Sequence, residues 1–304
     1  MVERQPRFGW YELLTTDLAA AQSFYGAVLG WQTRSAATPR FDYRLFTMGE
    51  RAVCGLMELP PEGRRMGAAP RWVGYVVVDD LESMVARLQR LGGAVYVPPT
   101  ETNIGRVSIV RDPQGATLAL AQELNIAQQP AEPDPSGGVG WHELLATDAK
   151  TAFVFYNELF GWERAQPVAG AMDSYQLLSA GGHTIGGMFN KLPIAPFPFW
   201  LYYFDVADVG VAARRVTAAG GRITQGPNEL PGVGWMVWCL DPQGAMFALQ
   251  SPANEGGAEN SAPPSSAGRL PGAASHRAAN WSPMPSPYPD GKGNWGPATI
   301  SRRG

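Results

Sequence analysis

The chain has 304 residues, of which 45% are hydrophobic, 17% charged and 11% aromatic, so it has the composition of an ordinary globular protein with room for about two domains. A formal net charge of -3 leaves no basic excess to neutralise phosphates, and nucleic acid is not expected as a partner. The sequence has neither an apolar run near the roughly 18 residues that a membrane-spanning helix needs nor a secretion signal, so we expect a cytoplasmic protein with no membrane partner.

The first predicted elements form a β-α-β-β-β unit. The segment from Phe8 to Thr15 alternates like a strand, and Asp17 can cap the helix that follows it. Gly30 suits the left-handed turn that ends such a helix. Two of the strands after the helix flank a Gly49-Glu50 turn. The apolar stripe of the helix is Ala21, Phe24, Tyr25, Val28 and Leu29, and the two flanking strands are 43–48 and 51–57.

The next stretch repeats this order of elements. A continuous apolar strand, 72–78, precedes Asp80, which can cap a helix that ends at Gly92-Gly93. Strands are predicted at 94–97, 106–111 and 116–121, and the last two flank an Asp-Pro-Gln-Gly turn. The second stretch is therefore another β-α-β-β-β unit.

The second half of the chain is a copy of the first. Gly9-Trp-Tyr-Glu-Leu-Leu-Thr-Thr-Asp17 returns 131 positions later as Gly140-Trp-His-Glu-Leu-Leu-Ala-Thr-Asp148, and 12 of the 23 positions from Gly9 to Trp31 are identical between the copies. The pentapeptide Asp112 to Ala116 also returns, at 241–245. The sequence therefore predicts four β-α-β-β-β units, two in each copy.

Composition sets the domain boundaries. We predict a first domain at 7–124, a Pro- and Gly-rich linker at 125–138 and a second domain at 139–252. The remaining segment, 253–304, is rich in Pro, Gly, Ser and Ala, and we expect it to be disordered because it cannot bury enough apolar surface. A partner-binding tail anchored by Trp281, Tyr288 and Trp295 is the alternative for that segment.

The repeated Gly-Trp-x-Glu-Leu-Leu-x-Thr-Asp string, the helix after it and the Asp-Pro-Gln-Gly-Ala turn resemble motifs of the vicinal oxygen chelate (VOC) superfamily. This superfamily includes glyoxalase I, bleomycin-resistance proteins and extradiol dioxygenases. The resemblance covers about Arg7 to Ser251 and implies an α+β fold of two tandem VOC domains. In that family two modules curl their sheets into a cup, helices pack outside, and a metal bound by His, Gln or Glu chelates vicinal oxygens of the substrate. One fold hosts many reactions, so the resemblance is specific for fold and weak for chemistry.

The family's metal-ligand positions carry unsuitable residues in this chain. The position usually held by His falls on Trp10 and Trp141, and the position usually held by Glu falls on Ala119 and Ala248. The middle ligand falls on Val73 or Gly74 in one copy and on Leu201 or Tyr202 in the other. None of these side chains is a plausible ligand for a divalent ion. We therefore expect no cofactor, although a divalent metal bound elsewhere stays possible.

A repeated Trp-x-Glu motif stands where the family's first ligand would be. Strand alternation puts Trp10 and Glu12 on one face, and the resemblance turns that face toward the cup. Burial there raises a carboxylate's pKa, which makes Glu12 and Glu143 candidate general bases or substrate-orienting groups; a purely structural role for both is the alternative. Trp141 and Trp10 either line or plug the cups, and Tyr43 and Tyr175 are further ligand-binding candidates.

The other chemistry-bearing residues are assigned to structure. Alternation turns His142 away from Glu143, so we do not expect a metal site of His142, His183 and Glu143. Tyr25 and Tyr156, which recur on the helix stripe, are expected in the core. The two cysteines, Cys54 and Cys239, are expected to be small core residues that form no disulfide.

Two functions fit these features. The first is a glyoxalase- or bleomycin-resistance-like protein that binds a small apolar or aromatic, oxygenated molecule in its cups without the usual metal triad. The alternative is a lyase or dioxygenase of the VOC type that uses Glu12 or Glu143 as base, or a non-standard metal site. Either function makes a small molecule the partner of the protein, and the sequence does not specify its oligomeric state.

Overall fold

Each copy of the repeat folds into one eight-stranded mixed sheet. The computed structural model describes residues 5–37, 42–65, 67–125, 138–166, 175–192, 195, 197–230 and 234–252. The elements of the first copy are β1 (Arg7–Thr15), α1 (Leu18–Leu29), β2 (Gln32–Ser35), β3 (Tyr43–Met48), β4 (Arg51–Glu58), α2 (Pro61–Arg65), β5 (Arg71–Val77), α3 (Leu81–Arg90), β6 (Ala94–Thr102), β7 (Gly105–Arg111) and β8 (Thr117–Gln122). Apart from the short helix α2, this order is the predicted pair of β-α-β-β-β units.

The second copy repeats the order. Its elements are β9 (Val139–Ala146), α4 (Ala149–Phe160), β10 (Glu163–Arg164), β11 (Gln176–Ala180), β12 (His183–Asn190), β13 (Phe199–Asp205), α5 (Val209–Ala218), β14 (Arg222–Leu230), β15 (Gly234–Leu240) and β16 (Met246–Pro252). The strand orders are β2-β3-β4-β1-β5-β8-β7-β6 and β10-β11-β12-β9-β13-β16-β15-β14. The predicted α+β class and the four units are confirmed. The predicted linker, except its end residues 125 and 138, and the predicted tail lie outside the described residues.

The helices begin and end where capping chemistry predicted. The Asp17 carboxylate accepts the Ala20 backbone N–H, and Asp148 caps α4 in the same way. Gly30 and Gly161 end these helices with a φ of 73° each. Strand ends were less predictable, because β6 continues through Pro98 and Pro99 to Thr102. It is an edge strand with register shifts, where a missing N–H is tolerated.

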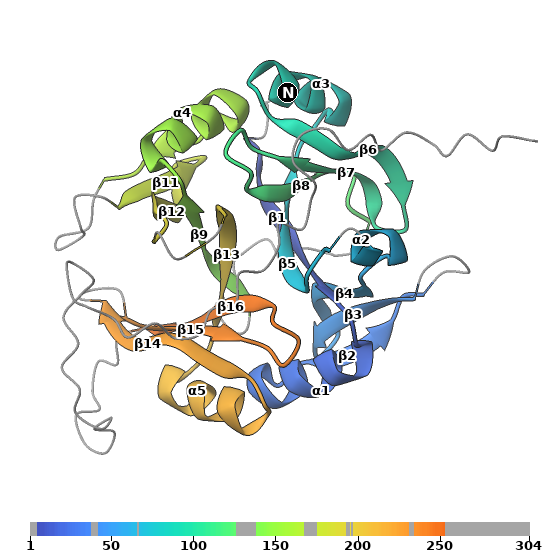
Figure 1. The fold of residues 1–304 in the computed structure, drawn as a ribbon, viewed down its shortest axis with the longest axis vertical. Helices are drawn as coiled ribbons and strands as arrows, with labels where there is room; N and C mark the ends of the chain where they lie inside the picture. Colours follow the sequence, from blue (N-terminus) through green and yellow to red (C-terminus); the bar gives the residue numbers. More distant parts are fainter. Residues whose placement is uncertain are drawn as a thin grey trace, which may run out of the picture.

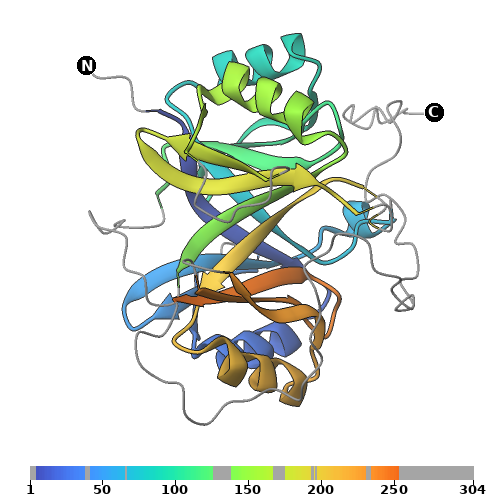
Figure 2. The ribbon, with the colours of Figure 1, turned by 90° about the vertical axis from the view of Figure 1, so that its left-hand side faces the viewer.

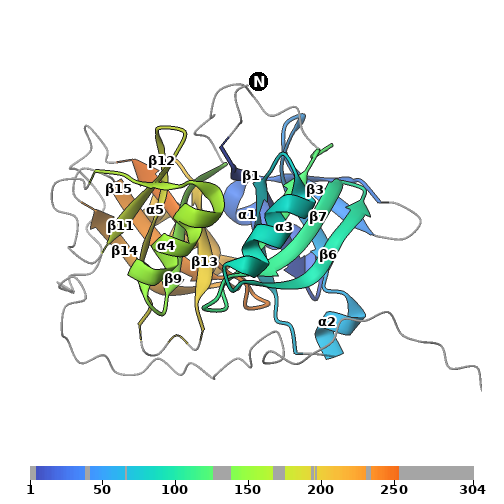
Figure 3. The same ribbon diagram turned by 90° about the horizontal axis from the view of Figure 1, so that it is seen from above.

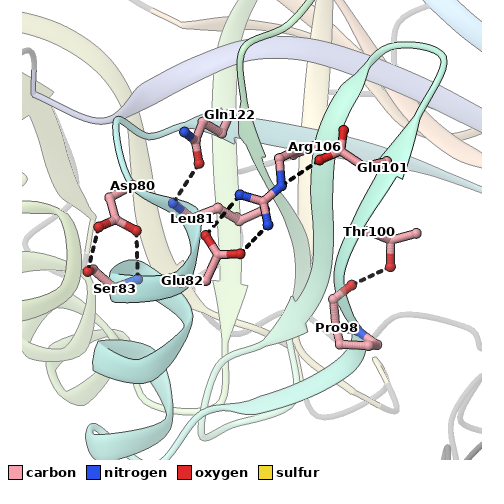
Figure 4. Close-up of polar contacts among 9 residues, drawn as sticks. All are labelled: Asp80, Leu81, Glu82, Ser83, Pro98, Thr100, Glu101, Arg106 and Gln122. Carbon is pink, nitrogen blue, oxygen red and sulfur yellow. Dashed lines mark hydrogen bonds and ion pairs between the residues drawn. The ribbon is translucent and has the colours of Figure 1, made fainter.

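Helix α3 is fastened to its own sheet by polar contacts that Figure 4 shows. Asp80 accepts the Ser83 backbone N–H, and the side chain of Gln122 on β8 accepts the Leu81 N–H at 3.1 Å. Arg106 on β7 forms ion pairs with Glu82 of the helix and Glu101 of β6. These contacts lie on the helix-bearing face of the sheet, opposite the side chains described below as the candidate site.

The core lies between the two sheets and is shared by both copies. Each sheet curves, and the convex faces meet along β1, β5, β9 and β13 (Figure 1). Helix α1 of the first copy packs beside α5 of the second, and α3 beside α4 (Figures 1 and 2). The copies therefore share each helix layer, and a view from above shows the two sheets beside each other (Figure 3).

Repeated residues hold the copies together. The Tyr25 hydroxyl donates to Asp241 at 3.2 Å, and the Tyr156 hydroxyl donates to Asp112 at 3.1 Å. Each tyrosine thus joins the helix of one copy to the Asp-Pro-Gln-Gly turn of the other. The predicted core role of Tyr25 and Tyr156 is confirmed, and so is the burial of Cys54 and Cys239 as free thiols. Among the helices of the described ranges, none has the length and apolarity needed to span a membrane.

Candidate functional site

The concave face of each sheet carries the Trp-x-Glu motif. On β1, Trp10 and Leu14 belong to an apolar cluster on the inner face, whereas Leu13 and Tyr11 belong to the core between the copies. We call the inner face of the first sheet the first cup and that of the second sheet the second cup. The residues that form the first cup are Trp10, Tyr43, Leu45, Val73, Tyr75, Ile104, Val107, Ala119 and Ala121.

Glu12 is buried in the first cup against two phenols. Its side chain is 3% exposed, the Tyr75 hydroxyl donates to its Oε1 at 3.0 Å, and Tyr43 also hydrogen-bonds to it. The Trp10 indole N–H donates to the Tyr43 hydroxyl at 3.2 Å. Burial raises the pKa of Glu12 to about 7, and the two phenol hydrogen bonds offset part of that shift. The carboxyl group therefore changes charge near neutral pH.

A glycine makes room for this arrangement. Gly55 on β4 pairs with Glu12 in the strand register, and a Cβ at Gly55 would overlap the hydroxyl of Tyr43. The second copy uses the same device, since Gly187 pairs with Glu143 and a Cβ there would overlap the ring of Tyr175. The missing side chain lets each tyrosine lie across the neighbouring strand and reach the carboxylate.

The second cup repeats the cluster and extends it. Glu143 is 6% exposed, accepts the Tyr175 hydroxyl at 2.6 Å, and also accepts the Tyr203 hydroxyl. The Trp141 indole donates to Tyr175 at 3.0 Å, and the Trp238 indole donates to Tyr203 at 2.6 Å. Burial raises the pKa of the Glu143 carboxyl. It also raises the pKa of the Tyr175 and Tyr203 phenols well above the ordinary value, helped by the charge of Glu143.

The structure brings together the side chains singled out from sequence. Trp10, Glu12 and Tyr43 form one connected set in the first cup, and Trp141, Glu143 and Tyr175 form the other. Sequence reasoning missed Tyr75 and Tyr203, which complete the clusters. A signal was present, because each lies three residues after the repeated Trp72 or Trp200. Trp238, also missed, has no aromatic counterpart in the first copy and so gave no repeat signal.

The two cups differ in how far their aromatic rings are covered. Trp10 and Tyr43 are each 3% exposed, whereas Trp141 and Tyr175 are half-buried. Ile104, from the turn between β6 and β7, is buried in the first cup. The second cup is formed by Leu145, Leu201, Tyr203, Trp238 and Ala248, with half-buried Trp141, Phe189, Phe199, Met236 and Met246 around them.

The donor atoms of the cups do not fit a divalent metal. Of the alternatives for the middle family position, Val73 and Leu201 face the cups, and both are aliphatic. The oxygens of Glu12 and Glu143 already accept phenol hydrogen bonds, and phenols with a raised pKa stay protonated and are poor ligands. Within the described ranges, His, Cys, Asp and Glu nowhere form a group of three or more able to hold a metal ion.

His142 lies on the opposite face of β9 from Glu143, as alternation predicted. Its Nδ1 contacts the Ile185 carbonyl, which can only accept, so Nδ1 carries the proton and Nε2 accepts the Tyr11 hydroxyl at 2.5 Å. Burial lowers the pKa of His142 to about 4. His183, the other histidine considered, is exposed at the start of β12.

Comparison with known proteins places this geometry in a family. The model of the Glyoxalase/Bleomycin resistance protein/Dioxygenase superfamily matches residues 7–120 and 138–249. The "Putative glyoxylase CFP32" of Mycobacterium bovis is 33% identical over 254 residues, covering 82% of this chain and 96% of that protein. The anthracycline biosynthesis protein DauV of a Streptomyces species is 26% identical over 257 residues, covering 79% of this chain and 91% of that protein.

A solved structure shares the fold at low identity. The Mn(II)-bound glyoxalase from Novosphingobium aromaticivorans superposes with a TM-score of 0.60 at 15% identity, covering 82% of this chain and 83% of that one. Two matches to the family model, one in each copy, agree with the two sheets and four modules described above. The chain therefore belongs to the Glyoxalase/Bleomycin resistance protein/Dioxygenase superfamily and carries two tandem domains of that family.

Proposed function

We propose that the protein binds small, oxygenated aromatic or apolar molecules in its cups, without a metal triad. The observation that carries this proposal is the cluster of one buried carboxylate and two phenols, which recurs in both copies inside an otherwise apolar wall. Burying a carboxylate costs free energy unless hydrogen bonds or a ligand satisfy it. The presence of this buried cluster in both copies is what we expect of a duplicated binding site, whose apolar walls hold a ligand and whose polar centre orients it.

The direction of the hydrogen bonds indicates the kind of ligand. In the first cup Trp10 donates to Tyr43, and both Tyr43 and Tyr75 are bonded to Glu12. The hydroxyl protons of the cluster are thus directed inward, onto the carboxylate, and what is left for a ligand is acceptor capacity on carboxylate and phenol oxygens. A ligand with a hydroxyl group satisfies that capacity. The names of the relatives, a glyoxylase and an anthracycline biosynthesis protein, are consistent with oxygenated ligands.

Replacement of the two carboxylates tests the proposal. We expect saturation-transfer NMR to detect binding of at least one of phenol, catechol and alizarin, and binding to persist in EDTA. The matched variants Glu12→Gln and Glu143→Gln preserve side-chain shape and remove the charge. Affinity should fall tenfold or more, about 1.4 kcal/mol, in at least one variant, with the fold intact by circular dichroism. Unchanged affinity in both variants, or binding abolished by EDTA, would contradict the proposal.

A base-catalysed lyase is the second candidate, and one observation favours it. The pKa of Glu12 lies at about 7, which is the range in which a carboxylate both accepts and returns a proton at neutral pH. In such a reaction Glu12 would take a proton from carbon next to a carbonyl group. Exchange of that carbon-bound hydrogen in deuterated water, measured by NMR and lost in Glu12→Gln, distinguishes the lyase from a binding protein.

A further inference from the structure

Aromatic rings reach across the second cup. Phe189 on β12 and Trp238 on β15 belong to strands that β9, β13 and β16 separate in the sheet order, yet their ring centroids are 6.3 Å apart with 28° between planes. Tyr175 also stacks with Phe189, with ring centroids 5.8 Å apart and 26° between planes. Phe189 thus stacks with a ring at the start of the neighbouring strand and with a ring from the opposite wall of the curved sheet.

The first cup keeps the polar cluster but not these rings. Met57 occupies the place of Phe189, since Met57 pairs with Leu14 as Phe189 pairs with Leu145. Ile109 occupies the place of Trp238, and it pairs with Ala119 as Trp238 pairs with Ala248. Three pairs of polar residues, one member in each cup, are equivalent: Glu12 and Glu143, Tyr43 and Tyr175, and Tyr75 and Tyr203. The copies therefore share the polar cluster and differ in the side chains that face it.

The ring pair is also connected to the polar centre. Trp238 donates its indole N–H to the Tyr203 hydroxyl at 2.6 Å, and that hydroxyl bonds to Glu143. A group held against the face of Trp238 therefore lies close to the oxygens of Glu143. Phe189 is half-buried and packs against the apolar cluster of the second cup, so its ring is not part of the core between the copies.

We propose that the second cup is the selective ligand site, in which Phe189 and Trp238 clamp a planar hydroxylated aromatic ring and Glu143 accepts a hydrogen bond from its hydroxyl group. This inference rests on the proposed function and assigns it to one cup and one ligand class. A ring sandwiched at van der Waals distance on both faces needs about 7 to 8 Å between the clamping planes. The observed centroid distance of 6.3 Å is an upper limit on the present separation of the two ring planes, so Phe189 has to move away from Trp238 to admit a ring. At the equivalent positions of the first cup, Met57 and Ile109 present no ring face.

Methionine methyl groups report on the two cups separately. Met57 packs in the first cup, and Met236, whose sulfur lies 3.6 Å from the Tyr203 hydroxyl, packs in the second. The protein is labelled at its methionine methyls, and Met57→Leu and Met236→Leu assign the two signals. Addition of alizarin, a planar dihydroxyanthraquinone, should shift the Met236 signal and leave the Met57 signal unchanged. The non-planar alcohol cyclohexanol at equal concentration should shift neither.

Variants of the clamp complete the test. Phe189→Leu and Trp238→Leu should each weaken alizarin binding tenfold or more, whereas the matched first-cup variants Met57→Leu and Ile109→Val should change it less than twofold. Trp238→Phe keeps a ring face and should retain most of the affinity. This variant separates the effect of losing the ring from the effect of misfolding in Trp238→Leu. A shift at Met57 in place of Met236 would overturn the assignment and leave the proposed function standing. Unchanged affinity in both leucine variants would overturn the clamp, and absence of shifts at both methionines would overturn the assignment and weaken the proposed function.

Discussion

The two cups have the same polar centre in different surroundings. In the first, Trp10 and Tyr43 are almost fully covered, and aliphatic Met57 and Ile109 face the cluster; in the second, Trp141 and Tyr175 are half-buried, and Phe189 and Trp238 face it. In both cups, protein groups alone satisfy the hydrogen bonding of the carboxylate, so its contribution to folding stability does not depend on a ligand. The comparison therefore teaches that the carboxylate and its phenols belong to the repeated architecture, and it makes the residues that differ the ones to which our proposal assigns ligand choice.

The largest expected effect comes from the core that the cups share. Trp162 is fully buried, donates to the Pro6 carbonyl at 2.7 Å and contacts Phe8 of the first copy with ring centroids 5.6 Å apart. Trp162→Ala should lower the free energy of unfolding by about 3–5 kcal/mol through lost packing. Because the core is continuous, both cups should unfold in one transition, which denaturant titration followed at the Met57 and Met236 methyls measures.

The control for this prediction is Val154→Ala, since Val154 is 51% exposed on α4 and its truncation should change little. Separate transitions for the two methyl signals in Trp162→Ala would show that the cups are energetically independent.

The next effect concerns the pH dependence of the free energy of unfolding, to which Glu12 and His142 contribute in opposite directions. The pKa of Glu12 is about 7 in the fold against 4.5 as the ordinary value, so stability falls as pH rises between these values, by about 3 kcal/mol in total. The pKa of His142 is about 4 against 6.5, so stability falls as pH drops between these values. These two slopes largely cancel each other, and the raised pKa of Glu143 adds to the slope of Glu12.

Variants separate the two slopes. The stability of Glu12→Gln should fall relative to that of the parent as pH falls from 6.5 toward 4.5, because His142 acts with less opposition. His142→Gln should instead gain stability as pH falls from 7 to 5, and Glu143, whose pKa is also raised by burial, should act in the same direction as Glu12. Urea unfolding across this pH range measures the slopes, and equal slopes in parent and both variants would contradict the assignment.

The smallest expected effect is a difference in folding stability between variants of the two glycines beside the carboxylates. Gly55→Ala and Gly187→Ala each introduce a methyl group into the space of a tyrosine, an overpacking that costs about 1–3 kcal/mol. Tyr43 is buried within β3, whereas Tyr175 is half-buried and precedes β11. Gly55→Ala should therefore cost more than Gly187→Ala in thermal unfolding, and the reverse order would show that the second cup is the more rigid one.

Local chemistry made much of the fold predictable. Asp17 and Asp148 began their helices, Gly30 and Gly161 ended them, and period-two alternation placed Glu12 and Glu143 correctly in the cups. Contacts between distant segments were not predictable in this way. Nothing near Tyr25 in the sequence indicates Asp241 of the other copy, and nothing near Phe189 indicates Trp238.

The site was predictable only in part for the same reason. Trp10, Glu12 and Tyr43 lie early in one module, while Tyr75 enters from β5, a strand that the sequence does not place beside β1. Its pairing with Trp10 is set by the sheet, in which β5 is antiparallel to β1. A strand order had to be known before the second phenol could be assigned.

The contact between Tyr11 and His142 shows what fusing two copies into one chain permits. These residues are the same position of the repeat, and they meet each other, the phenol donating and the imidazole accepting at 2.5 Å. A dimer of identical subunits must place the same residue on both sides of its symmetry axis, so two tyrosines or two histidines would meet there and a tyrosine–histidine pair could not form. Duplication within a single gene removes that restriction. Each half could therefore evolve to fit the other and not itself, and the same freedom allowed the two cups to diverge in the side chains that line them.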